Sequence, residues 1–182
     1  CWESDTWDPY AYAMDYDSRR PFFEQLDELL KKVPKKTTYT NPHTKLGPNI
    51  RSDYTNVAGG NKDCYMLFNG GGNENVSYTR GISFSRDTLD SYFGVKLERC
   101  YEAINANNSS GVVFGHNVTA TIDSWFMVNA SGCQNCFGCV NLRHKSYHFL
   151  NEPLQKEAYE ARVAEIRGSY ANLEAFKKEF ES

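Results

Sequence analysis

An internal repeat constrains the fold of this chain more than any other sequence feature. Between residues 61 and 151, a small residue precedes a run of aromatic or β-branched residues, and Asn, Asp or Gly stands at the ends of the unit. Most of the small residues follow one another at steps of 12, and a longer step of 15 is offset by a step of 9. They are Cys64, Val76, Ser91, Cys100, Val112, Ser124, Cys136 and Ser146. A fixed period of this kind is typical of solenoids.

Short strands at this spacing predict two strands in each coil of about 24 residues. A small residue at one place in every coil fits a crowded interior corner. Aromatic rings at one place stack from coil to coil inside the solenoid, and Asn fits tight turns and hydrogen-bonded ladders. We therefore predict a mainly β fold, a right-handed parallel β-helix or similar β-solenoid. The alternative is a β-sandwich or barrel of seven or eight short strands, which does not require such a recurrence.

Helical patterns flank the repeat on both sides. Pro21, followed by apolar residues at helical spacing, predicts a helix over 20–33 that ends in a lysine-rich segment. After the repeat, Asn151 is the predicted N-cap of a second helix, and Gly168 and Ser169 separate it from a third. The domain prediction is an aromatic strap, helix and linker over 1–60, a solenoid over 61–151 and a helical cap over 152–182. The caps are expected because an open terminal coil exposes unpaired backbone groups that can pair with another chain.

Composition and charge limit the function classes. The chain of 182 residues is 40% hydrophobic and 24% charged with a net charge of −3, so it is foldable and carries no overall basic footprint for nucleic acid. No window approaches the roughly 18 apolar residues of a membrane helix, which predicts no membrane partner. The acidic, aromatic opening is unlike a secretory leader and lacks Met, so we expect a processed or trimmed cytoplasmic chain with reduced thiols.

Two segments carry a resemblance to a known family. The first is Cys133-Gln-Asn-Cys-Phe-Gly-Cys-Val-Asn-Leu-Arg143 with Lys145-Ser-Tyr-His-Phe-Leu-Asn-Glu-Pro-Leu154, and the second is the opening Cys1-Trp2 with Arg20-Pro-Phe-Phe-Glu-Gln-Leu26. They resemble an uncharacterised family of candidate-phyla bacteria with Cys-, Tyr- and Asn-rich repeats. The resemblance implies that Cys1-Trp2 ends an N-terminal zinc ribbon that lies upstream. It implies no activity, and Ser or Val at several repeat positions where relatives carry Cys argues against a metal in every coil.

The best metal candidate is the run Cys133, Cys136 and Cys139 with His144, because thiolates and imidazole form tetrahedral sites for a structural zinc ion. The competing interpretation is that Cys136 fills the small-residue position of the repeat, as Ser124 does. Cys133 and Cys139 are then packed hydrophobic residues. No second Cys pair completes a zinc knuckle.

Two function classes remain open. The first is a non-enzymatic binding or scaffold module whose partner is a protein or a nucleic acid. The second is a carbohydrate-active β-helix hydrolase or lyase, which needs carboxylates that converge in a groove. Asp63, Asp90 and Asp123 open three of the repeat units, where Asn in other units is expected to form turns. A carboxylate cluster at these positions favours the enzyme, and carboxylates at separate turns favour the binding module.

Overall fold

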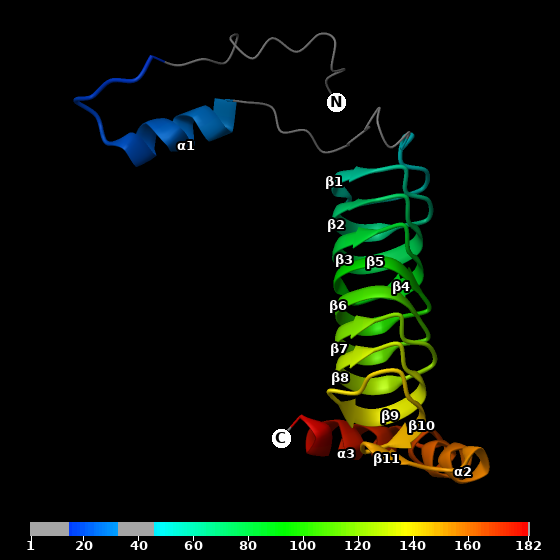
Figure 1. The fold of residues 1–182 in the computed structure, drawn as a ribbon. Coiled ribbons are helices and arrows are strands. Elements are labelled where there is room, and N and C mark those ends of the chain that lie inside the picture. Colours follow the sequence, from blue (N-terminus) through cyan, green and yellow to red (C-terminus); the bar gives the residue numbers. More distant parts are fainter. Residues whose placement is uncertain (1–14, 33–45, 182) are drawn as a thin grey trace.

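The structure is a computed structural model that describes residues 15–32 and 46–181. A long, narrow stack of coils follows helix α1, and two helices lie at its C-terminal end (Figure 1). The helices are α1 (Phe22–Lys32), α2 (Lys156–Arg167) and α3 (Tyr170–Phe180). The strands are β1 (Asn56–Gly59), β2 (Tyr65–Gly71), β3 (Glu74–Ser83), β4 (Arg86–Leu89), β5 (Tyr92–Glu98), β6 (Tyr101–Ser110), β7 (Val113–Thr119), β8 (Trp125–Ser131), β9 (Gln134–Val140), β10 (Ser146–Phe149) and β11 (Glu152–Pro153).

Parallel pairing at a constant offset defines the coil. Asn56 lies beside Phe68 and Tyr92 beside Ile104, in each case 12 residues apart. The predicted β-solenoid is therefore confirmed, with about eight turns. The predicted coil of about 24 residues is wrong, because each 12-residue repeat closes a complete coil. The first such pairing joins Ile50 to Lys62, so the stack begins upstream of residue 61.

The coil is built from triplets. Every third residue from Arg51 to Leu150 has a left-handed backbone, with φ between +43° and +71°. The residue just after each of these points into the stack, and from Ala58 to Cys139 these inward residues are buried, with half-buried Gly70 as the exception. Repeated left-handed corners turn the chain tightly enough for four inward positions to fit into one coil. Asn, Asp and Gly tolerate this conformation best, which explains their frequency.

Inward side chains bond along the stack. Ser85 Oγ donates to the carbonyl of Ser83 two residues earlier and accepts the amide N–H of Leu97 in the next coil. Ser124 does the same with Ile122 and Cys136. Small polar residues are thus favoured inside because they pair backbone groups that otherwise face an apolar interior. This accounts for the Ser, Thr and Cys in the repeat, except for Thr79, whose buried hydroxyl has no partner among the described residues.

Buried asparagines form a ladder in the first coils. Asn61 Nδ2 donates to Asn49 Oδ1 at 2.9 Å, and Asn73 Nδ2 donates to Asn61 Oδ1 at 3.0 Å. Asn73 Oδ1 accepts the amide of Ser85 at 3.0 Å, and its Nδ2 also donates to the carbonyl of Ile82. An outer ladder joins Asn105, Asn117, Asn129 and Asn141. The predicted Asn ladders are confirmed, on both sides of the coil wall.

Two details of the predicted repeat are wrong. Thr88, rather than Ser91, occupies the inward position between Val76 and Cys100, and His148, rather than Ser146, follows Cys136, because the true step is 12 throughout. Aromatic rings do stack between coils, but they lie outside them. The buried, inward-facing series from Ala58 to Cys139 contains no aromatic residue, since four inward positions in 12 residues leave too little room.

The C-terminal end is closed by a hairpin and two helices. β11 pairs antiparallel with β10, and Asn151 is its turn residue with φ +67°. The prediction that Asn151 is a helix N-cap is therefore wrong. Its side chain forms hydrogen bonds with the backbone of Val140, and α2 begins after Gln155. Gly168 and Ser169 separate α2 from α3 as predicted. Both helices pack on the flank of the last coils, around Phe126, Phe137 and Phe149.

Helix α1 precedes the stack. It begins after Pro21 and ends within the predicted range of 20–33. The Gln25 side chain fixes its first turn by accepting the amide N–H of Asp17 and donating to the carbonyls of Asp17 and Arg20. The apolar side chains of Phe22, Phe23 and Leu30 are exposed. Most of the predicted aromatic strap, Cys1 and the lysines at 35 and 36 lie outside the described residues.

Candidate functional site

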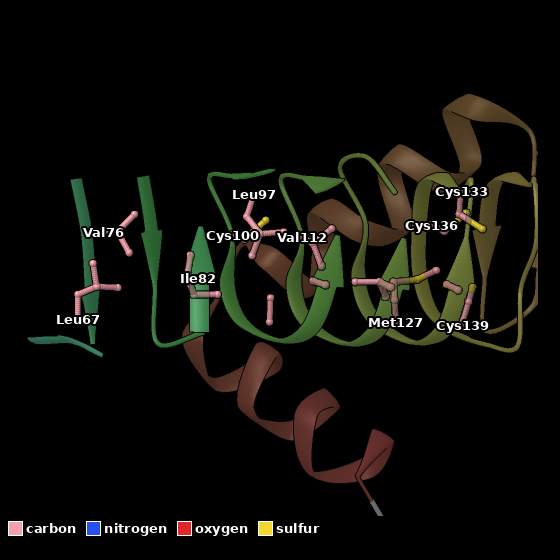
Figure 2. Close-up of a cluster of buried hydrophobic side chains, with 14 of the residues drawn as sticks. Leu67, Val76, Ile82, Leu97, Cys100, Val112, Met127, Cys133, Cys136 and Cys139 are labelled. Atoms are coloured by element: carbon pink, nitrogen blue, oxygen red, sulfur yellow. The ribbon is translucent and has the colours of Figure 1, made fainter. Parts of the chain in front are cut away.

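The three clustered cysteines point into one coil. Cys133, Cys136 and Cys139 occupy three successive inward positions, and all are at most 1% exposed (Figure 2). Each thiol lies 3.4 to 3.5 Å from the carbonyl oxygen two residues earlier, the same bond that inward serines make. Cys136 therefore fills the small-residue position of the repeat, as one of the two interpretations predicted.

The pKa values of these thiols follow from burial and from a hydrogen bond between Cys136 and Cys139, which lowers the pKa of Cys139. Burial raises the pKa of Cys133, and a hydrogen bond with Cys139 together with burial raises that of Cys136. His144 has a left-handed backbone and lies outside the coil, where its ring covers Gly132. The structure thus brings the thiols together without His144. Within residues 15–32 and 46–181, no group of three or more His, Cys, Asp or Glu is arranged to hold a metal.

The three aspartates are distributed along the stack. Asp63 and Asp123 share one outward position but are five coils apart, about 24 Å at the usual strand spacing. Asp90 lies at a different corner of the coil. Asp63 pairs with Arg51 in the preceding coil through two bonds of 2.6 and 2.8 Å. Catalytic carboxylate pairs of glycosidases are separated by about 5–9.5 Å, so these residues do not form one.

One outer face of the stack carries aromatic residues from end to end. We define the outer aromatic face as one corner of every coil. It consists of the left-handed residue at that corner and the outward residue just before it, at 53–54, 65–66, 77–78, 89–90, 101–102, 113–114, 125–126, 137–138 and 149–150. Because these pairs recur every 12 residues, their side chains form two adjacent rows along the stack. Its rings are Tyr54, Tyr65, Tyr78, Tyr101, Phe114, Trp125, Phe126, Phe137 and Phe149.

Helix α3 covers the C-terminal half of this face. The Phe176 ring lies 5.0 Å from Phe126 and 4.9 Å from Phe137, measured between ring centroids. Lys177 Nζ donates to Glu102 at 2.8 Å and lies 4.2 Å above the Phe114 ring. The covered half of the outer aromatic face therefore extends to the coil of Glu102, where an ion pair ends it.

The N-terminal half is open to solvent. Tyr54 is 71% exposed and Tyr78 53%, and Tyr65 lies between them with edge-to-face contacts of 5.4 and 5.5 Å. Leu89 continues the row at 40% exposure. A groove of about 370 Å³ runs beside these rings, lined by Met66, Phe68, Tyr78, Thr79, Arg80, Asp90, Ser91 and Tyr92. Exposed apolar surface that continues a buried interface is a candidate docking surface.

A second groove lies under α2. Its volume is about 620 Å³, and its walls include Arg99, Asp123 and Asn135 of the stack and Tyr159 and Arg167 of α2. Arg167 lies 4.0 Å above the Trp125 ring, so the aromatic side of this groove is already occupied by the chain itself. The open half of the outer aromatic face is therefore the better candidate for an external partner.

Comparisons with known proteins add no functional information to these observations. Neither a protein-family model nor a curated protein matches the chain. The resemblance to the candidate-phyla family and its upstream zinc ribbon therefore stays a prediction. Among the described residues, no helix is both long and apolar enough to cross a membrane.

The sequence did not lead us to the open aromatic half as a site. From the sequence, an outer aromatic face that stacks bases or sugars was conceivable, but we preferred rings that stack inside the solenoid. The signal was present: buried small or apolar residues recur every third position, which assigns Tyr65 and Tyr78 to the outside.

Proposed function

We propose that this chain is a non-enzymatic binding module that holds a protein partner on the open half of its outer aromatic face. The observation that carries the proposal is the exposed row of Tyr54, Tyr65 and Tyr78, which continues the same row that binds α3. Tyrosine is enriched at protein interfaces, where its ring gives large contact area at low entropic cost. The stacked coils hold these rings in fixed positions.

The form of the partner follows from α3. This helix docks on the face through Leu173, Phe176 and Phe180, one apolar stripe of an α-helix, and through Lys177. An amphipathic helix laid into an apolar groove is a common recognition mode. The open half offers the same row spacing, so an amphipathic helix of a partner protein is the ligand that we propose.

Charge favours protein over nucleic acid. Several cations of the stack are already paired with carboxylates: Arg51 with Asp63, and Lys62 and Arg86 with Glu74. Nucleic-acid binding needs cations that are free to reach phosphates. The groove beside the rings of the open half is lined by one cation, Arg80, together with Asp90, rather than by a basic row that could follow a phosphate backbone.

A displayed library of amphipathic helical peptides, panned against the full chain, tests the proposal. We expect binders whose affinity falls at least tenfold, about 1.4 kcal/mol, in Tyr78→Ser and is unchanged in Val95→Ser. Val95 is similarly exposed but lies at another outward position of the coil. Absence of binders, or binders equally insensitive to both changes, refutes the proposal. The same chain is also tested on oligonucleotide and glycan arrays. Binding there that is lost in Tyr78→Ser would assign the surface to a nucleic acid or a glycan instead of a protein.

A further inference from the structure

We infer that helix α1 is an intramolecular occupant of the open half of the outer aromatic face, and so competes with the external partner. The inference concerns the same surface as the proposed function, and it is measured separately. Two exposed apolar surfaces motivate it. Phe22 and Phe23 of α1 are 55% and 78% exposed, and the tyrosines at 54 and 78 are similarly open on the stack.

Helices α1 and α3 share the features that dock α3. Each carries a leucine with an apolar residue three positions later, Leu26 and Leu29 in α1 and Leu173 and Phe176 in α3. Each ends in a Lys-Lys pair in its last turn. In α3, the first lysine of that pair, Lys177, bonds Glu102 at the edge of the covered half. In α1 the lysine pair follows the apolar pair one residue later than in α3, so the two helices share the order of apolar and basic residues but not their exact spacing.

The open half offers matching groups. Tyr65, Tyr78 and Leu89 supply the apolar row, and Asp90 lies beside it with no ion pair among the described residues. Lys32 of α1 would take the place that Lys177 takes in α3, because Lys31 already pairs with Asp27 within its own helix. The two halves are one continuous surface, so a helix in the open half extends an interface that the chain already uses.

The chain length permits this contact within one molecule. Residues 33–45 separate α1 from Leu46, which packs against Gly60 and Gly71 in the first coils. Thirteen residues span at most about 45 Å when extended. The coils from Tyr54 to Leu89 occupy only about 15 Å of stack, since neighbouring strands are about 4.8 Å apart. A second copy of the chain is therefore not needed to bring α1 to the tyrosines.

Photo-crosslinking in the full chain tests the inference. A benzophenone amino acid replaces Tyr78, and in a control replaces Val95. We expect an adduct of monomer mass that joins position 78 to a peptide within 22–32, and no such adduct from position 95. An adduct of two chains assigns the surface to a second copy and overturns the inference. Absence of any adduct with 22–32 also overturns it.

Matched variants separate docking from loss of helix. Leu26→Ala keeps helix propensity while it removes an apolar contact, and should lower the yield of adduct; Glu24→Ala, at another position of the same helix, should not. If α1 covers the surface nine-tenths of the time, Leu26→Ala also strengthens binding of a selected helical peptide about tenfold. If the affinity for the peptide is the same in Leu26→Ala as in the unchanged chain, the inference is contradicted but the proposed function is not. Absence of peptide binding together with a clear adduct contradicts only the proposed function.

Discussion

Replacing Asn73 with alanine tests the hydrogen bonds that hold the inside of the stack together. Asn73 is 2% exposed. Its side chain donates to Asn61 Oδ1 and to the carbonyl of Ile82, and it accepts the amide N–H of Ser85. The alanine variant leaves the Ser85 amide without its acceptor in an apolar interior, whereas the Ile82 carbonyl keeps its place in the parallel ladder of β2 and β3.

The expected loss follows from the Ser85 amide. A buried polar group left without a partner costs about 1–3 kcal/mol, so the variant should lose about 1–3 kcal/mol of unfolding free energy. That is a substantial part of the roughly 5–15 kcal/mol that stabilises most domains. Asn107→Ala is the matched control. Asn107 is outward-facing on β6, its side chain forms no hydrogen bond within the described residues, and its change should stay within about 0.5 kcal/mol.

Denaturant unfolding followed by circular dichroism measures the free energy, and hydrogen exchange locates it. In the variant, the amide of Ser85 should lose protection, because its acceptor is gone. Repeat stacks do not always unfold in one step, so the exchange rate at this amide is the local check. A loss no greater than that of Asn107→Ala, with Ser85 still protected, would refute the role of the buried ladder.

Three further outcomes follow from the structure. Lys96 is exposed with φ +55°, so Lys96→Gly should stabilise the fold by about 0.5–1 kcal/mol in denaturant unfolding; Glu98→Gly, outside the left-handed region, should destabilise it by a similar amount. The hydrogen bond from Arg51 lowers the pKa of Asp63 below its ordinary value of 3.8, so this pair stabilises the fold at neutral pH and ceases to do so as pH falls through the lowered pKa. The melting-temperature advantage over Asp63→Asn should therefore be present at neutral pH and vanish in strong acid, and an advantage that persists there contradicts the ion pair. Cys136→Ser should change the unfolding free energy by less than about 1 kcal/mol and leave bound zinc unchanged, because the hydroxyl of Ser124 makes the equivalent bond one coil earlier. A fall in zinc content would instead assign the cysteine cluster to a metal.

The solenoid was predictable because small residues recur at one inward position of the repeat. Cys64, Val76, Cys100 and Val112 do share one inward position, and their spacing revealed the parallel stack. The coil length was missed because we followed only one of the four inward positions. Ser91 then looked like a displaced member of the series, when Thr88 holds that place and Ser91 belongs to the next inward position.

The site was harder to predict for a physical reason. A left-handed residue at every third position allows large side chains such as Tyr78 and Phe126 to stand on corners that sequence rules reserve for Asn and Gly. Propensity therefore does not reveal which rings face outward. The distinction between covered and open rings depends on where α3 docks, and this is set by long-range contacts such as Lys177 with Glu102.

Because the coil is built from triplets, the number of residues between two points of the stack sets the directions in which their side chains face relative to each other. Adding or removing three residues preserves which side chains point inward but rotates everything downstream by a quarter of a coil relative to everything upstream. The tyrosines at the start of the stack and the ring cluster under α3 lie on one line only because the distance between them is a multiple of 12. An insertion of three residues would aim them in perpendicular directions, whereas an insertion of 12 would only lengthen the line. Changes in the number of coils are thus the route by which such a protein alters its reach without altering its orientation.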